Sequence, residues 1–386
     1  MPLLGEVRYA ARRLLRAPGF TVVAVATLAL GIGANAAIFG LVDSVLLRSL
    51  PYPEPDRLVM AWQDYTRREG PANEWFSPAN YLDYRSQAAS FEALGAFTGA
   101  GATLTGEGEP QPVAGGSVTV DFFRALGASP LHGRLFLPEE DVVDGPNVVV
   151  LGHDLWQARF GGDPSVVGRA VQLNGQPYEV VGVLRPGFEF PLLPGADVFF
   201  PLGIDGPEPS RGAIFIRVVG KLEPDVPLEA AGAELSAIAA RLEAEYPNHN
   251  TGVGATIEPL RDRLVGSVRA GLLVLFAGVG AVLLIACVNL ANLLLARAGA
   301  RRRESAVQAA LGAGAFRIAR LHLLESGLLA AAGGALGLLL AGWLMDVLVL
   351  LSPLGLPAMF EPSLNGSVTA FAVCANAGAG MRWRRR

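Results

Sequence analysis

The sequence contains almost no lysine, and this scarcity excludes one kind of nucleotide-binding site. Lys221 is the only lysine among the 386 residues, and Leu222 follows it. A phosphate-binding loop of the G-x-x-x-x-G-K-[ST] type needs a lysine directly before a hydroxyl residue. The chain has no such loop, so we predict that it is not an enzyme and that any ATP-driven work depends on an ATPase on another polypeptide.

Cysteine and histidine are also scarce. The two cysteines, Cys287 and Cys374, both lie in apolar surroundings, which argues against a disulfide framework. No two histidines are closer than 21 residues, so no helical metal-binding pair exists. No G-x-S-x-G nucleophile elbow occurs either. We therefore predict no catalytic residues, no metal and no cofactor in this chain. The histidines are His132, His153, His249 and His322.

Charge is low and unevenly distributed. Charged residues make up 17% of the chain, against about 25% in typical globular proteins. Residues 48–269 carry 29 acidic and 17 basic side chains, whereas the remainder carries 6 acidic and 14 basic. This pattern predicts an acidic soluble domain between membrane segments with basic edges. It excludes a nucleic-acid partner, which requires a basic folded domain.

Four uncharged runs account for the shortage of charge. Three of them, Ala17–Val42, Ala270–Ala296 and Ser326–Met345, reach the length of about 20 residues that a helix needs to span a bilayer. The first greatly exceeds the apolar stretch of about 7–15 residues in a signal peptide, so we expect an uncleaved signal anchor. The fourth run, Pro362–Met381, is rich in alanine and glycine and predicts only a weak, degenerate span.

The second run contains small and polar residues whose roles the sequence leaves open in part. Gly278 and Gly280 would allow close packing against another helix. Asn289 and Asn292 lie near the end of the run. They either form hydrogen bonds between helices or simply occupy the interfacial zone, and the sequence does not distinguish these alternatives.

The placement of arginine orients the predicted spans. Arginines precede the first run, fill the loop at 297–325 and end the chain, whereas the loop at 346–361 has no basic residue. By the positive-inside rule these arginine-rich parts are cytoplasmic and the acidic domain faces outward. The predicted segments are 1–19 basic N-terminus, 20–47 first span, 48–268 outward domain, 270–296 second span, 297–325 cytoplasmic coupling loop, 326–345 third span, 346–361 outer loop and 362–386 weak fourth span with basic tail.

The sequence of the outward domain predicts an α+β fold. The stretch "SPANYLDYRSQAASFEALGAF" indicates a helical region that begins with Ser77 as N-cap and Pro78 at the first helical position. "NVVVLG" indicates a short buried strand, and Asn174-Gly175 is typical of a two-residue hairpin turn. Residues 226–246 have apolar side chains at helical spacing, which predicts a helix with one buried face.

No feature of this domain points to catalysis. The acidic stretch "PEEDVVDGP" could bind a cation, but it lacks the ligand spacing and central glycine of a calcium loop, so we predict a solvated turn. His153 follows a predicted strand and is expected to be structural. The domain is therefore predicted to be a binding or force-transmitting module. The acidic residues are Glu139, Glu140, Asp141 and Asp144.

Several stretches resemble a known family. "ACVNLANLLLARAGARRRESAVQAALGAGAFRIARLHLLESGLL" is similar to the FtsX-like permease domain of MacB-type ABC transporters. "DFFRALGASPLHGRLF" and "LWQARFGGDPSVVGRAVQLNGQPYEVVGVLRPGFEFP" resemble the MacB-type periplasmic core domain. The opening "YAARRLLRAPGFTVVAVATLALGIGANAAIFGLVDSVLLRSLPYPEPDRL" resembles the duplicated-permease, ADOP-like branch of that family.

The resemblance implies a function and its partners. Such permeases sit as multi-pass proteins in the bacterial cytoplasmic (inner) membrane with the large domain in the periplasm. They form homodimers or paired permeases and recruit a separate ABC ATPase subunit that binds the ATP. They then transmit its motion outward, for export or mechanotransmission. The resemblance places ATPase coupling at Arg302, Arg303, Glu304, Val307, Gln308, Leu311 and Gly312.

The sequence departs from the family pattern at two places. Ser305 and Gln308 replace the usual aliphatic and basic residues of the coupling helix, and the likeness fades after Val373. The latter predicts a truncated or frameshifted C-terminus. The alternatives for this chain are a membrane-anchored extracytoplasmic binding or scaffold protein, a non-functional truncated permease and a membrane-tethered hydrolase. For the segment at 301–312 itself, the alternative to coupling is a basic juxtamembrane anchor.

Overall fold

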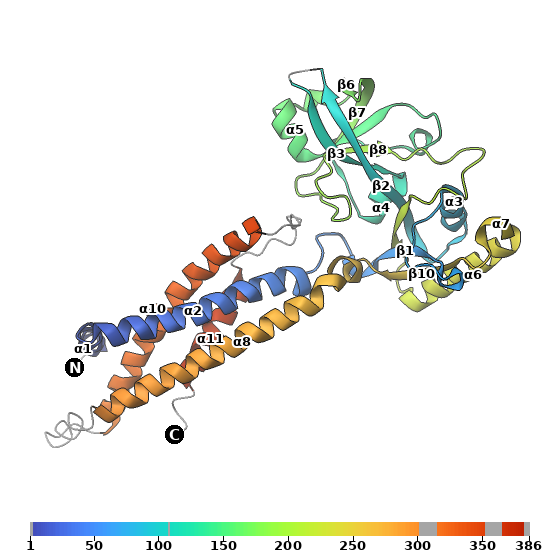
Figure 1. Ribbon diagram of the computed structural model, residues 1–386. Helices are drawn as coiled ribbons and strands as arrows, with labels where there is room; N and C mark the ends of the chain where they lie inside the picture. The colour runs from blue at the N-terminus through green and yellow to red at the C-terminus, as the bar shows by residue number, and fades with distance from the viewer. Residues whose placement is uncertain (1–2, 107–108, 301–314, 352–364, 382–386) are drawn as a thin grey trace. The chain divides into compact units, whose positions relative to one another are not determined.

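The computed structural model describes residues 3–106, 109–300, 315–351 and 365–381. The chain divides into two compact units (Figure 1). The membrane unit comprises Met1–Arg48 and Val268–Arg386, and the outward unit comprises Ser49–Ser267. The predicted coupling residues between 302 and 312 lie outside the described residues.

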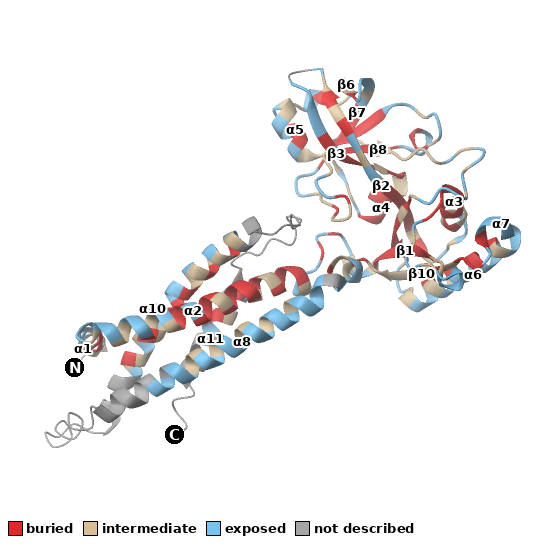
Figure 2. Cartoon of the chain, in the orientation of Figure 1, coloured by how far each residue is buried: buried red, intermediate tan, exposed pale blue. Residues whose placement is uncertain are grey.

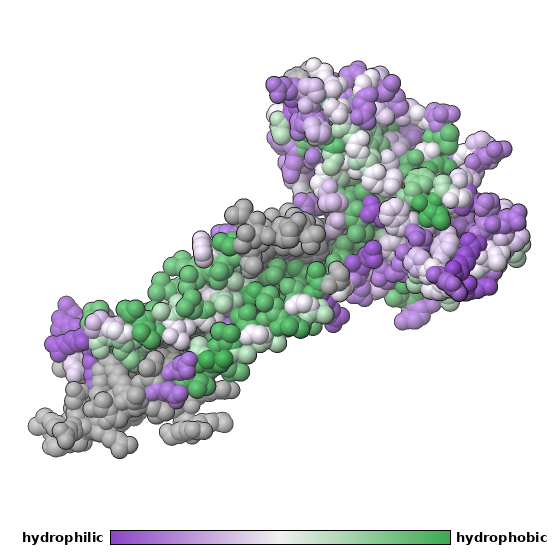
Figure 3. Space-filling view, viewed as in Figure 1, coloured by the Kyte–Doolittle hydropathy of each residue, from purple (hydrophilic) through white to green (hydrophobic). Residues whose placement is uncertain are grey.

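The described part of the membrane unit is helical, and its surface is dominated by apolar residues (Figure 3). Within the described residues, three helical stretches are long and apolar enough to cross a bilayer: Pro18–Leu47, Val268–Asn289 and Leu323–Val347. Helices of sufficient length thus form over the three predicted runs, and their bounds as membrane spans stay a prediction, while the weak fourth run forms a helix of 16 residues. The helices are α1 (Leu3–Leu15), α2 (Pro18–Val42, continued by a π-helical turn at Asp43–Leu47), α8 (Leu260–Ala300), α10 (Ala315–Leu351) and α11 (Gly366–Met381).

Helices α2 and α10 form the centre of this unit. A Cβ atom added to Gly333 of α10 would lie 2.6 Å from the Cβ of Leu28 on α2. The two helices share an apolar cluster, which buries Leu28, Ile32 and Ala36 of α2 together with Ala341 of α10. Because lipid is as apolar as these side chains, close packing rather than hydrophobicity favours the contact.

Helix α8 is far less covered than α2 by the described residues of the chain (Figure 2). In the apolar 18-residue segment of α8 only 6% is buried, against 56% in the corresponding segment of α2. A Cβ atom added to Gly278 or Gly280 would meet nothing within 4 Å. No described residue of this chain therefore approaches these two glycines, and their role in helix packing stays a prediction, whereas glycines of α2 and α10 make close contacts between helices.

The outward unit is built on a ten-stranded mixed sheet. Its strands run in the order β10-β1-β9-β2-β3-β8-β5-β7-β4, with β6 paired to β2 and β7. All strand pairs are antiparallel except β3 with β8 and β5 with β7. The strands are β1 (Leu58–Asp64), β2 (Phe91–Thr105), β3 (Gln111–Val118), β4 (Pro130–Gly133), β5 (Val148–Leu151), β6 (Ala170–Leu173), β7 (Gln176–Leu184), β8 (Val198–Pro201), β9 (Arg217–Leu222) and β10 (Gly254–Pro259).

Strand β2 is long enough to belong to two hydrophobic cores. Its first half packs with β1 and β9 against the buried residues Leu235 and Ile238 of α6. Its second half contributes Ala102 and Leu104 to a second core, which contains Trp156 of α5. The described helices of this unit are α3 (Pro78–Gln87), α4 (Val120–Ala125), α5 (His153–Phe160), α6 (Leu228–Glu245) and α7 (Pro247–Asn250).

Local signals in the sequence are confirmed at several points. The Ser77 side chain accepts a hydrogen bond from the N–H of Asn80, with Pro78 in the first turn of α3. Asn174 and Gly175 have φ angles of +53° and +75° and join β6 to β7 as a two-residue turn. Helix α6 and the fully buried strand β5 also form where we expected them, so the α+β fold is confirmed.

One local prediction is wrong. The stretch "FEALGAF" was expected to continue the helical region that starts at Ser77, but α3 ends at Gln87 and Phe91 begins β2. Pairing with β9 along Phe91–Phe97 and with β3 from Phe97 onward overrides the helical preference of alanine, leucine and glutamate. The segment is thus a strand because of its tertiary partners.

Candidate functional site

Two ion pairs fix α1 to the beginning of α10, close in sequence to the predicted coupling segment. Arg320 Nε lies 3.2 Å from Glu6 Oε2, and Arg13 Nη1 lies 3.1 Å from Glu325 Oε1. Glu325 is buried and directly precedes the uncharged run at Ser326. Because a carboxylate at the edge of a membrane span is costly without a counter-charge, the pair with Arg13 stabilises this arrangement.

A second polar cluster lies at the other end of α2. Asn365 donates a hydrogen bond of 2.8 Å from Nδ2 to Asp43 Oδ2, and its Oδ1 accepts one of 2.9 Å from the N–H of Val368. The same side chain therefore caps α11 and connects it to the π-helical turn that ends α2. Arg48 lies 3.9 Å from the Asp43 carboxylate and adds a positive charge.

Asn35 makes the polar contact between α2 and α8. Its Nδ2 donates to the carbonyl oxygens of Gly31, at 2.8 Å, and of Val279 on α8, at 3.1 Å. The sequence placed such a bond at Asn289 or Asn292 as one of two alternatives. Both of these side chains are exposed in the described chain, which fits the interfacial alternative. The sequence does not predict this contact of Asn35, because the residue lies inside an otherwise apolar run.

The acidic stretch at 139–144 is only partly the solvated turn that we expected. Glu140 and Asp141 are buried, each 6% exposed. Glu140 accepts two short hydrogen bonds from Arg134 and one from the N–H of Leu137. Asp141 accepts from the N–H groups of Val120 and Gly203. The prediction is wrong for these two residues because long-range donors, which local spacing does not reveal, satisfy both carboxylates.

The pKa values of these two neighbouring carboxyl groups are shifted in opposite directions. Burial opposes ionisation of Glu140, but the hydrogen bonds from Arg134 and Leu137 outweigh it, so the pKa of Glu140 is lowered. Burial dominates at Asp141, and its pKa is raised despite the bonds from Gly203 and Val120. Both carboxyl groups connect loops through hydrogen bonds. No group of three His, Cys, Asp or Glu side chains that could hold a metal ion occurs among the described residues.

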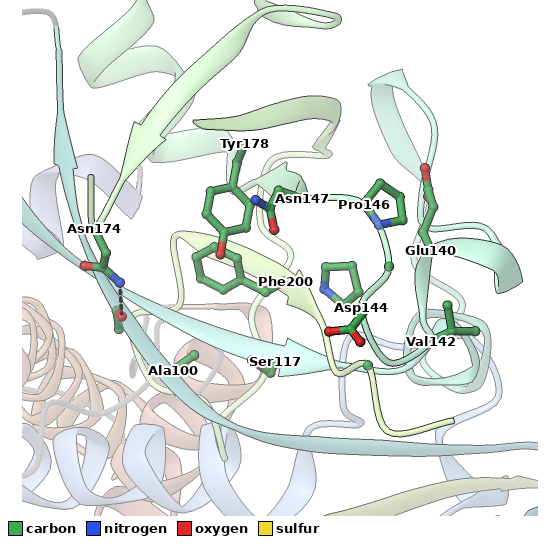
Figure 4. Close-up of a pocket in the computed structure, with 14 residues that line it drawn as sticks. Ala100, Ser117, Glu140, Val142, Asp144, Pro146, Asn147, Asn174, Tyr178 and Phe200 are labelled. Carbon is green, nitrogen blue, oxygen red and sulfur yellow. Dashed lines mark hydrogen bonds between the residues drawn. The ribbon is translucent and has the colours of Figure 1, made fainter. Parts of the chain in front are cut away.

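An open cavity of about 390 Å³ lies next to this stretch (Figure 4). Tyr178 and Phe200 form one part of its wall, with ring centres 5.2 Å apart and planes nearly perpendicular. Asp144, Asn147 and Asn174 add polar groups to the lining. The described residues that line it include no histidine, cysteine or lysine. The lining thus combines two aromatic rings with carboxylate and amide groups.

His153 lies at the start of a helix beside a tryptophan. It begins α5, and its ring lies edge-on to Trp156 with centres 5.6 Å apart. Its Nδ1 is 3.1 Å from the exposed carboxylate of Asp154. The ring of His132 also packs against Trp156, with centres 5.2 Å apart, and the structural role of His153 stays a prediction.

Comparison with protein families decides what the chain is. The model of the MacB-like periplasmic core domain matches residues 21–238, more than half of the chain, and that of the FtsX-like permease C-terminal domain matches residues 276–382. The chain belongs to the MacB/FtsX type of ABC transporter permease. The permease match extends nine residues beyond Val373, so the prediction that the likeness fades there is wrong.

Two relatives carry the name macrolide export ATP-binding/permease protein MacB. The protein from Agrobacterium fabrum is 26% identical over 264 residues, covering 66% of this chain and 38% of the relative. The protein from Nitrosomonas europaea is 28% identical over 217 residues, covering 54% of this chain and 31% of the relative. The chain thus spans about a third of the length of these relatives, and it aligns with their permease part.

Part of the chain is also similar to solved structures. A domain of a putative permease from Porphyromonas gingivalis matches 55% of this chain and 93% of its own, with 14% identity and a TM-score of 0.41. The periplasmic region of MacB from Actinobacillus actinomycetemcomitans matches 55% and 92%, with 16% identity and a TM-score of 0.40.

Membership of this family defines the general class and domain organisation of the protein. It is a membrane protein with an α+β extracytoplasmic domain, and its family works with an ABC ATPase partner. The carboxylates and amides described above position loops and helices of this permease. The membrane unit supplies the elements that lead toward the predicted coupling segment, namely α8, α10 and the attached α1.

Proposed function

We propose that this permease receives ATP-driven conformational change from a separate ATPase and transmits it to its outward domain. The ATPase would bind ATP and contact the segment that contains Arg302, Arg303, Glu304 and Leu311. The permease itself would need no cofactor. This mechanism requires a mechanical connection between the coupling segment and the outward sheet.

The continuity of α8 supports the proposal most strongly. This helix of 41 residues begins at Leu260, directly after Pro259 ends β10, and continues to Ala300 next to the coupling segment. At 1.5 Å per residue a helix of this length measures roughly 60 Å. A continuous helix resists compression along its axis, so a displacement at Ala300 reaches β10 without an intervening loop.

The attachment of β10 determines where that displacement acts. β10 pairs with β1 from Val59 to Asp64 and forms the edge of the sheet. Ile257 of β10 packs against the core beneath α6. Movement of α8 would therefore pull on an edge strand and on α6, and the remainder of the sheet would respond through the β1–β9 ladder.

Partner and location form the remaining part of the proposal. The exposed apolar surface of α8 leaves room for a second permease, which supports a homodimer or paired permease in the membrane. We place the protein in the bacterial cytoplasmic membrane with its large domain in the periplasm, since the arginine-rich ends of its spans agree with that orientation.

Co-purification with an active ATPase tests the proposal. The full-length chain, expressed with an affinity tag in its native host, should retain an ABC ATPase whose activity is measured in nanodiscs. Reversal of charge at Arg302, Arg303 and Glu304 together should reduce the retained ATPase activity at least tenfold. Reversal at Arg384 and Arg385 in the basic tail is the matched control and should leave that activity unchanged.

Each outcome of this experiment separates the alternatives. Loss of ATPase activity with the loop variant alone supports coupling through this segment. Retention of full activity in the loop variant, or absence of any ATPase from the purified chain, would contradict the proposal and favour a membrane-anchored binding or scaffold protein. Turnover of a substrate by the purified chain without ATPase would instead indicate a tethered hydrolase.

A further inference from the structure

Two arginines of the outward unit lie against aromatic rings and form no ion pair within the described chain. The guanidinium carbon of Arg217, on β9, is 4.6 Å from the ring centre of Phe97 and 5.5 Å from that of Trp75. The guanidinium carbon of Arg263, in the first turns of α8, is 4.8 Å from the ring centre of Trp62. Such contacts favour a cation but do not neutralise its charge.

The strand register brings these side chains to one face of the sheet. Phe97 on β2 is the direct antiparallel partner of Arg217. On the other side of β9, Val218 pairs with Ala61, so continuing the ladder by one residue places Trp62 beside Arg217. Because directly opposed residues point to the same face, Trp62, Arg217 and Phe97 form one row, and Arg263 covers its end at Trp62.

The positive charge at this row is not compensated. Burial lowers the pKa of Arg217, and the charge of Arg263 lowers it further. The Nε of Arg217 is closed off from solvent and has no acceptor, so only the terminal nitrogens are left to contact a bound anion. Glu258 accepts a hydrogen bond of 2.9 Å from the indole of Trp62 and forms no ion pair with either arginine in the described structure.

The depth of Arg263 along α8 identifies the environment of the site. Arg263 precedes the apolar span at Val268 by five residues, or about 7.5 Å of helix. The headgroup region on each side of a bilayer is roughly 5–7.5 Å thick, so Arg263 lies at its outer edge. Trp75, which is 40% exposed, supplies an amphipathic ring of the kind enriched at this level.

We propose that Arg217 and Arg263, flanked by Trp62 and Trp75, bind the phosphate of an anionic phospholipid in the leaflet that the outward domain faces. Two guanidinium groups provide the planar, multiple donors that phosphate oxygens accept. The exposed indole of Trp75 would cover the glycerol region of the same lipid. A bound headgroup would hold β9 and the first turns of α8 together at the membrane surface.

The test uses the full-length protein in a neutral detergent, with lipid adducts counted by native mass spectrometry. Phosphatidylglycerol should bind at least tenfold more tightly than phosphatidylcholine. Arg263→Gln removes an exposed guanidinium and should weaken phosphatidylglycerol binding about tenfold, the effect of one charge-assisted hydrogen bond. Arg241→Gln, which removes an exposed arginine of α6, is the matched control and should change nothing.

A second variant, at the half-buried Arg217, separates loss of lipid binding from loss of folding. Arg217→Lys keeps the charge but loses the planar donor set, and it should weaken phosphatidylglycerol binding while the melting temperature stays close to that of the parent. Equal binding of the two lipids, or equal behaviour of Arg263→Gln and Arg241→Gln, would overturn the proposal. Displacement of the lipid by millimolar inorganic phosphate would also overturn it, since the site would then bind a soluble anion.

Discussion

Gly33 of α2 lies directly against the backbone of Gly337 in α10. A Cβ atom at Gly33 would be 2.9 Å from the carbonyl oxygen of Gly337, and one at Gly337 would be 3.1 Å from the Cβ of Ile32. The two helices therefore touch through their backbones, and no side chain larger than hydrogen fits at either position without movement. Small residues at helix contacts are the usual means of association in a bilayer, where apolar burial contributes little.

Gly33→Val should separate α2 from α10. The added methyl groups would overlap the α10 backbone, and overpacking of this kind costs about 1–3 kcal/mol. The melting temperature of the full chain in detergent measures the loss. Gly278→Val on α8, where a Cβ meets nothing within 4 Å, is the control and should have little effect. Equal melting temperatures for the two variants would show that the α2–α10 contact is looser than described.

Gly266 tests whether α8 acts as a continuous rod. A Cβ there meets nothing within 4 Å, so Gly266→Ala should only strengthen the helix, whereas Gly266→Pro should break it at a cost of about 3 kcal/mol. In the complex with the co-purified ATPase, we expect the proline variant to lose transport or signalling while ATP hydrolysis continues. Full function of the proline variant would argue against transmission through α8.

Gly95 is required where α4 crosses β2. A Cβ at Gly95 would collide with the backbone of Phe122, whereas one at Gly99, further along the same strand, would meet nothing within 4 Å. Gly95→Ala should therefore destabilise the outward domain by at least about 2 kcal/mol, because the obstacle is backbone and cannot rotate away. Gly99→Ala should be neutral. Chemical denaturation of the full chain, followed by tryptophan fluorescence, distinguishes the two.

The lowered pKa of Glu140 predicts a pH dependence of stability. A carboxylate whose pKa is lower in the folded state stabilises the fold above its unfolded pKa of about 4.3, and this contribution disappears as the pH falls through the folded value. Glu140→Gln should cost about 1–2 kcal/mol at pH 7, at the lower end for charged hydrogen bonds because Arg134 is partly exposed.

The pH profile separates this effect from simple misfolding. Melting temperatures of the parent chain and of Glu140→Gln should converge as the pH falls from 6 toward 3, since protonated glutamate and glutamine are then both neutral. A difference that stays constant over this range would mean that the Arg134–Glu140 pair contributes through packing rather than charge.

The pair of Glu6 and Arg320 should respond to an exchange of charges. Glu6→Arg would replace the carboxylate that lies 3.2 Å from Arg320 Nε by a second positive charge and release α1 from α10. Adding Arg320→Glu restores an opposite pair and should restore the attachment. Chymotrypsin cleavage of α1 at Tyr9, in detergent-solubilised full chain, provides the measurement because none of the substitutions alters that site: fast in the single variant, slow in the parent and the double variant. Equally slow cleavage in all three would indicate that other contacts hold α1.

Elements whose formation depends on neighbouring residues were predictable from short stretches of the chain. A bilayer-length run without charge predicts a membrane helix regardless of its neighbours, and the arginines at its ends predict the orientation. In the same way, Ser77 followed by Pro78 starts a helix, and Asn174-Gly175 adopts the positive φ angles of a hairpin turn. These features depend on residues within a few positions of one another.

Contacts between residues that lie far apart in the chain could not be predicted in this way, because they depend on the fold. Glu140 and Asp141 have the same local pattern as a solvated acidic turn, and their burial follows from Arg134 and from the backbone of Val120 and Gly203. "FEALGAF" became a strand because β9 and β3 provide its hydrogen bonds. Likewise, glycines mark a helix contact only when another backbone approaches them, which occurs at Gly33 and not at Gly278.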